Sequence, residues 1–101
     1  MARIFVTAKA DADIDTIVAT MARRGGVGSA EKYLGLFEQV YARLAMHPGS
    51  GFARKLLGPN ARIVPVSPFV MIYDWEPAAD TVTVLRVVRG RRRITRRLVR
   101  G

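Results

Sequence analysis

The sequence predicts an α+β protein in which a helical hairpin packs on one face of an antiparallel sheet. Two observations support this fold class. After residue 7, apolar residues recur every three to four positions in two segments, which is typical of amphipathic helices. Runs rich in β-branched and aromatic residues stand at residues 2–7 and again after residue 60, which is typical of strands. The expected order of elements is therefore β-α-α-β-β-β.

The first helix is expected to begin after Thr7 and to end at the sequence GGVG, residues 25–28. A threonine hydroxyl can accept a hydrogen bond from a free N–H of the first turn, so Thr7 is a suitable N-cap. Acidic residues in the early turns suit the positive end of the helix dipole. These acids are Asp11, Asp13 and Asp15, and the apolar face consists of Ala10, Ile14, Ile17, Val18 and Met21.

The second helix is expected to run from a cap at Ser29 to about Met46, before the proline-glycine break HPGSG. Because the loop between the two helices is short, we expect them to pair antiparallel as a hairpin. The apolar face of the second helix consists of Tyr33, Phe37, Val40, Tyr41 and Leu44.

Three strand-like runs follow, at residues 61–66, 69–76 and 80–88. The loops between them are so short that neighbouring strands must be antiparallel. Pro65 cannot donate a hydrogen bond to a neighbouring strand, which predicts an edge strand or a bulge at that point. Candidate core residues are Ile63, Val70, Ile72, Val82, Val84 and Val87.

The length of 101 residues indicates one domain, residues 1–101. With 50% apolar and 25% charged residues, the composition is typical of a globular protein. The absence of cysteine excludes disulfides, and one histidine is too few for a histidine-rich metal site. No cofactor is therefore expected. No apolar run is long enough to cross a bilayer, and the N-terminal residues do not resemble a signal peptide. We expect a protein of the bacterial cytoplasm without a membrane partner.

Positive charge is concentrated at the C-terminal end. The net charge is +9, and eight of the last sixteen residues are arginine, with no acid among them. Residues 1–85 hold eight acids and nine lysines or arginines, so this part is nearly neutral. Such a dense basic end, most marked at about residues 90–101, attracts phosphates or acidic segments. Three interpretations stay open: a solvated surface run, nucleic-acid binding, or an acidic peptide partner. The stretch lacks an aromatic residue on which bases could stack.

Catalytic candidates are few. His47 is the only histidine, and its place before Pro48 is typical of a structural residue at a helix end. Asp74 and Glu76 share one face of a strand, where solvated side chains are expected. Metal-free RNA cleavage would need arginines to stabilise the developing phosphorane charge and a group such as Tyr73 to move protons. The simpler interpretation is that Tyr73 only packs and that the arginines are solvated.

The order of these elements, together with particular residues, resembles the ParE branch of the RelE/ParE toxin superfamily of type II toxin–antitoxin systems, also called plasmid stabilisation proteins. The resemblance covers roughly Ile4 to Ile94. The matching residues are Ala10, Asp13, Ile14 and Ile17 of the first helix; Ala30 and Tyr33 of the second; Leu44, Pro48, Gly51 and Arg54; Leu57, Gly58 and Arg62; Phe69, Ile72 and Tyr73; and the run Val82 to Arg92.

The resemblance implies a helical hairpin packed on a twisted antiparallel sheet, and a cognate antitoxin whose C-terminal segment wraps and neutralises the toxin. The RelE-like branch cleaves messenger RNA in the ribosome with basic strand residues and a C-terminal tyrosine. This chain departs from that pattern, because Val64, Val70 and Leu98 stand at or near three of its catalytic positions. Arg62 can replace one strand lysine, and Arg92 retains a basic group.

ParE-like members inhibit DNA gyrase and are not known for a catalytic site of their own. We therefore expect a toxin that inhibits gyrase, contacts nucleic acid through the gyrase–DNA complex and is not itself an enzyme. The alternative is a ribosome-dependent or free messenger-RNA endoribonuclease, for which the catalytic candidates are Arg62, Tyr73, Arg86 and Arg92. The candidates for binding the target or an acidic antitoxin segment are Arg86, Arg89, Arg91, Arg92, Arg93, Arg96 and Arg97.

Overall fold

A computed structural model describes residues 1–101. Five strands form one sheet in the order β1-β5-β4-β3-β2. The central strands β3 (Ala61–Val66), β4 (Phe69–Glu76) and β5 (Thr81–Arg89) are antiparallel neighbours. Edge strand β2 (Phe52–Ala53) is antiparallel to β3, whereas edge strand β1 (Arg3–Val6) is parallel to β5. The predicted fold class is confirmed, with the difference that the sheet is mixed rather than wholly antiparallel.

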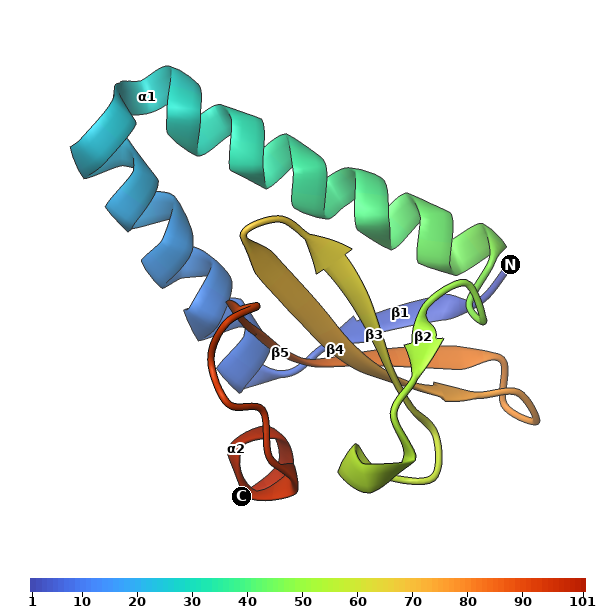
Figure 1. Ribbon diagram of the computed structural model, residues 1–101. Helices are drawn as coiled ribbons and strands as arrows, with labels where there is room; N and C mark the ends of the chain where they lie inside the picture. Colours follow the sequence, from blue (N-terminus) through green and yellow to red (C-terminus); the bar gives the residue numbers. More distant parts are fainter.

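The long helix α1 (Ala8–Met46) is bent at Gly26 into two arms, which lie over the same face of the sheet and diverge from the bend (Figure 1). Gly26 has φ 80° and ψ −177°, a conformation that only glycine adopts readily. Both predicted helices are thus present, but a single residue separates them instead of a four-residue loop. Ser29 is consequently inside the helix and is not its cap.

The predicted N-cap is confirmed. The hydroxyl oxygen of Thr7 accepts a hydrogen bond from the Ala10 amide (3.1 Å), and the hydroxyl donates one to the Leu85 carbonyl of β5 (3.1 Å). His47 is the C-cap of α1, in agreement with a structural role. None of the helices has the length and apolar character that a membrane span needs.

The main hydrophobic core lies between α1 and the sheet. Phe37 and Leu44 of α1 are almost completely buried, together with Tyr73, Val82 and Val84 of the sheet. The predicted helix faces are confirmed, since the buried α1 residues of this core are Ala10, Ile14, Ile17, Phe37, Val40 and Leu44.

A second, smaller cluster covers the opposite face of the sheet. There Ile72 and Val88 pack against Leu57 of the 3-10 helix η1 (Lys55–Leu57) and against Val99 of α2 (Arg96–Arg100). Figure 1 shows η1 and α2 on the side of the sheet opposite to α1. The end of the chain therefore folds as a short helix, with Thr95 as its N-cap.

One extra residue in β5 changes which side chains face α1. Tyr73 of β4 pairs with Val84 and Ile72 pairs with Arg86, so Leu85 is left as a bulge. The alternation therefore shifts, and Val87 rather than Arg86 points into the main core. On β3, the neighbour β2 covers only Arg62 and Ile63, which leaves Pro65 at a free edge as predicted.

Candidate functional site

The arginine-rich end comprises the last part of β5, a turn at residues 90–95 and α2. Its eight arginines are not equivalent, because three of them are held by other parts of the chain and five are not. The three held residues attach this end to the rest of the fold, and the other five are free to bind a partner.

Arg86 forms an internal ion pair with Asp13 of α1. Its Nε donates to Asp13 Oδ2 (2.7 Å), its Nη2 donates to Oδ1 (3.0 Å), and its Nη1 donates to the Leu98 carbonyl of α2 (2.9 Å). Both side chains are largely buried, at 16% and 17% exposed. The hydrogen bond to the Asp13 carboxylate raises the pKa of Arg86 above its usual value. Arg86 therefore joins α1, β5 and α2.

Arg100 fixes the other side of α2. Its Nη1 and Nη2 donate to both carboxylate oxygens of Asp74 (2.9 and 2.7 Å), and its Nε donates to the Leu57 carbonyl (2.6 Å). The expectation that Asp74 is simply solvated is therefore wrong. Gly58 has φ 151°, and a Cβ atom there would collide with the Arg100 guanidinium, so a glycine is needed beside this ion pair.

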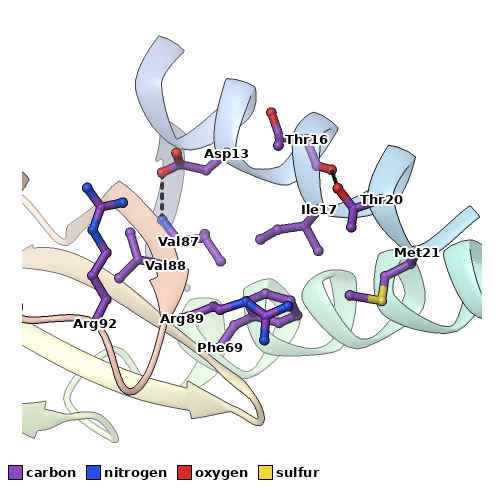
Figure 2. A pocket seen from close by; sticks show the side chains of 10 residues that line it. All are labelled: Asp13, Thr16, Ile17, Thr20, Met21, Phe69, Val87, Val88, Arg89 and Arg92. Atoms are coloured by element: carbon purple, nitrogen blue, oxygen red, sulfur yellow. Dashed lines mark hydrogen bonds between the residues drawn. The ribbon is translucent and has the colours of Figure 1, made fainter. Parts of the chain in front are cut away.

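Arg89 lies at the end of β5 with its guanidinium over the ring of Phe69, 5.6 Å from the ring centroid. Both residues line a cavity of about 240 Å³ between the first arm of α1 and β5 (Figure 2). Ile17, Met21 and Val87 supply apolar side chains to the same cavity, and its wall also includes Asp13, Thr16, Thr20, Val88 and Arg92. The cavity thus combines an apolar lining with two arginines at one side.

Five arginines are exposed and form no ion pair within the chain: Arg91, Arg92, Arg93, Arg96 and Arg97. The first three lie in the turn after β5, and the last two lie in the first turn of α2. The acids that this end contacts, Asp13 and Asp74, are already paired with Arg86 and Arg100, so the five charges have no carboxylate partner within the chain. Such a group of charges favours an anionic partner.

Two of the proposed nuclease residues serve the loop after α1. The Tyr73 hydroxyl donates to the Pro48 carbonyl (2.7 Å), and its oxygen accepts from the Gly51 amide (3.0 Å). Arg62 Nη1 donates to the carbonyls of Gly49 (3.1 Å) and Gly51 (2.8 Å). Burial raises the pKa of Tyr73, and the Gly51 hydrogen bond partly offsets this effect.

The structure does not bring the four nuclease candidates together. Arg62 and Tyr73 are cross-strand neighbours at the loop of residues 48–51, whereas Arg86 contacts α1 and α2, and Arg92 lines the cavity beside Arg89. Tyr73 is fully buried, so its hydroxyl cannot reach a solvent-borne substrate. A strand tyrosine preceded by an unbroken apolar run, Phe69 to Ile72, could have been recognised as a core residue from the sequence.

The comparisons with known proteins agree with this architecture. The model of the family described as ParE toxin of type II toxin-antitoxin system, parDE, matches residues 4–94. A solved structure described as a chromosomal ParDE toxin–antitoxin system from P. aeruginosa has the same fold, with a TM-score of 0.72 and 23% sequence identity. The similarity covers 88% of this chain and 96% of that chain. A comparison with curated proteins finds no match. The family match spans most of the chain, and we conclude that the protein belongs to the ParE toxin family of type II toxin–antitoxin systems.

Proposed function

We propose that the protein inhibits DNA gyrase and is neutralised by a cognate antitoxin that carries an acidic C-terminal segment. The observation that supports this function best is the group of five exposed arginines on the turn after β5 and on α2. They stand on a part of the backbone that two internal ion pairs hold in place. A preorganised backbone loses less conformational freedom on binding than a mobile segment does.

The two binding roles follow from the same surface. Guanidinium groups form paired, charge-assisted hydrogen bonds with carboxylates and with phosphates alike. When the antitoxin is absent, the arginines would contact the gyrase–DNA complex. When it is present, its carboxylates would occupy the same groups, so that inhibition of gyrase and neutralisation exclude each other.

The cavity between α1 and β5 suits an apolar side chain of the antitoxin segment. Ile17, Met21 and Val87 would contact that side chain, while Arg89 and Arg92 would pair with acids beside it (Figure 2). An apolar anchor with flanking carboxylates matches this lining better than a fully acidic peptide does. The anchor would contribute affinity by burying apolar surface, and the carboxylates would contribute orientation.

The internal contacts of the nuclease candidates favour gyrase inhibition over RNA cleavage. A phosphorane needs charged donors that converge on one point, and a leaving group needs a proton donor within hydrogen-bond reach. Tyr73 and Arg62 hold the loop of residues 48–51, and Arg86 holds Asp13. Arg92 is thus the one arginine among the candidates whose guanidinium forms no hydrogen bond within the chain, and a single arginine does not make a converging site.

The proposal is tested by DNA supercoiling with purified gyrase and increasing amounts of this protein, with linear DNA scored as a sign of trapped cleavage. We expect supercoiling to fall and linear DNA to accumulate, and an excess of antitoxin to reverse both effects. A folded protein that leaves gyrase unaffected but cleaves messages on translating ribosomes would instead establish the nuclease alternative.

A further inference from the structure

We propose that the protein has a nucleotide-binding site remote from the arginine-rich end, in the cavity beside β2, η1 and the end of β4. This cavity has a volume of about 170 Å³. Its chemically informative residues are Lys55, Asn60, Arg62 and Trp75, and the remaining wall is formed by Ala53, Pro59, Ala61 and Pro77. The proposal goes beyond gyrase inhibition and does not depend on it.

The charge of the cavity is positive and uncompensated. Lys55 is exposed and forms no ion pair, and Arg62 donates only to two neutral backbone carbonyls. No acidic residue lines the wall. Two cations around one small cavity without a carboxylate favour an anionic ligand, and a phosphate group accepts hydrogen bonds from both kinds of side chain.

The aromatic part of the wall favours a planar group beside that anion. The guanidinium of Arg62 lies 5.5 Å from the centroid of a Trp75 ring, and the ring edge at Cζ3 faces Gly49, where a Cβ atom would come within 2.9 Å. Aromatic rings and guanidinium planes are the surfaces on which nucleobases stack. Asn60 adds an exposed amide, which can donate to and accept from a base edge.

A phosphate to pair with Lys55 and Arg62, and a base to lie against the Trp75 indole and to bond with the Asn60 amide, together describe a nucleotide. We therefore assign the site to a 5′-phosphorylated nucleotide, either free or at the end of a strand.

Trp75 is the only tryptophan of the protein, so its fluorescence and its single indole N–H resonance can be assigned to one residue that lines this cavity. The folded full chain would be titrated with thymidine 5′-monophosphate, thymidine, inorganic phosphate and a 5′-phosphorylated oligothymidylate. We expect both signals to saturate with the monophosphate, and thymidine and phosphate alone to bind about tenfold or more weakly. Equal affinity for the monophosphate and the oligothymidylate indicates a site for one nucleotide, whereas tighter binding of the oligothymidylate places the site at a strand end.

The Lys55→Ala and Asn60→Ala variants are expected to bind the monophosphate less tightly, by about tenfold for the lysine. Both side chains are exposed, so the fold should be kept. Lys9→Ala is the matched control, since Lys9 is an exposed lysine outside this cavity. Saturation that persists unchanged in Lys55→Ala, or that disappears when Arg96 and Arg97 are neutralised, would overturn the proposal. So would inorganic phosphate binding as tightly as the monophosphate, or a flat titration with every ligand.

Discussion

Arg86 and Asp13 form a two-point ion pair although they are 73 positions apart in the chain. The same Asp13 carboxylate also accepts a hydrogen bond from the Val87 amide (2.9 Å), at the part of the β5 edge that β1 does not reach. Asp13 thus compensates the charge of Arg86 and accepts a hydrogen bond from the Val87 N–H, which has no strand partner at this edge. Arg86, which the sequence placed among the binding residues, is committed to this contact, and its substitution would alter the fold as well as any binding.

The Asp13 contact predicts that Asp13→Asn lowers the free energy of unfolding by about 1.5–3 kcal/mol, because a hydrogen-bonded charge partner of Arg86 is removed. Asp15→Asn is the matched control, since Asp15 is exposed and forms no ion pair. The control should stay within about 0.5 kcal/mol of the wild type. Urea unfolding of the three proteins measures the difference, and equal midpoints would contradict the structural role of Asp13.

The bend of α1 predicts opposite effects for two neighbouring glycines. Gly26→Ala should destabilise the protein by about 1–3 kcal/mol, because alanine at φ 80° is strained although no atom obstructs the new methyl group. Gly28→Ala should stabilise it by about 0.5–1 kcal/mol, because Gly28 is helical and its surroundings are equally open. Thermal unfolding of both variants gives the comparison. Destabilisation by both would show that the helix does not resume directly after Gly26.

We expect the protein to lose stability at alkaline pH, because the pKa of Tyr41 is raised in the folded state. Burial, with a smaller effect of the Asp11 charge, raises the pKa of Tyr41 from 10.0 to about 12. The folded state therefore retains the phenol proton while the unfolded chain releases it, so stability is complete below about pH 10 and falls as the pH rises towards 12. Tyr41→Phe should weaken this loss and leave the part that is due to Tyr73, whose pKa is also raised.

The same variant is expected to be at least as stable as the wild type at neutral pH, because the Tyr41 hydroxyl is buried without a hydrogen-bond partner. Urea unfolding at about pH 8 and about pH 11 tests both statements. An identical alkaline loss in wild type and variant would show that Tyr41 ionises equally in the folded and unfolded states.

Tyr73→Phe separates the two proposed activities. The substitution leaves the Gly51 amide and the Pro48 carbonyl without their partner, so we expect a loss of about 1–3 kcal/mol in unfolding free energy. Gyrase inhibition, measured below the unfolding temperature, should persist because the arginine-rich end is untouched. If the protein cleaves RNA, and the folded variant has lost that cleavage, Tyr73 has a catalytic role and the nuclease alternative is favoured.

The helices and central strands could be predicted because their patterns are local. Phe37 and Leu44 recur at helical spacing, and Val82 and Val84 alternate along a strand, so each buried face can be recognised within a few residues. The Leu85 bulge and the parallel pairing of β1 could not be predicted in this way. Both depend on how segments far apart in the chain align, which no local periodicity records.

The candidate site was predicted as a region but not residue by residue. The sequence shows eight arginines of equal chemistry. Only the tertiary structure separates the three that contact Asp13, Phe69 and Asp74 (Arg86, Arg89 and Arg100) from the five free ones. Asp74 lies 26 positions before Arg100, so no spacing rule joins them. The charge density indicated a partner, while the assignment of individual charges required the fold.

We expect substitution of the exposed arginines to weaken gyrase inhibition, and substitution of a held arginine to lower stability. Neutralising Arg96 and Arg97 together, as Arg96→Gln and Arg97→Gln, should leave the unfolding free energy within about 0.5 kcal/mol, since both are exposed and form no ion pair. Gyrase inhibition should weaken, because each lost charge-assisted hydrogen bond contributes about 1.5–3 kcal/mol to binding.

Arg100→Gln should instead lower stability, because Asp74 and the Leu57 carbonyl lose their donor. Deletion of residues 94–101 cannot make this distinction, since it also removes the buried Val99. Supercoiling assays and urea unfolding on the same preparations separate the two effects, and unchanged inhibition by the stable double variant would show that α2 does not contact the target.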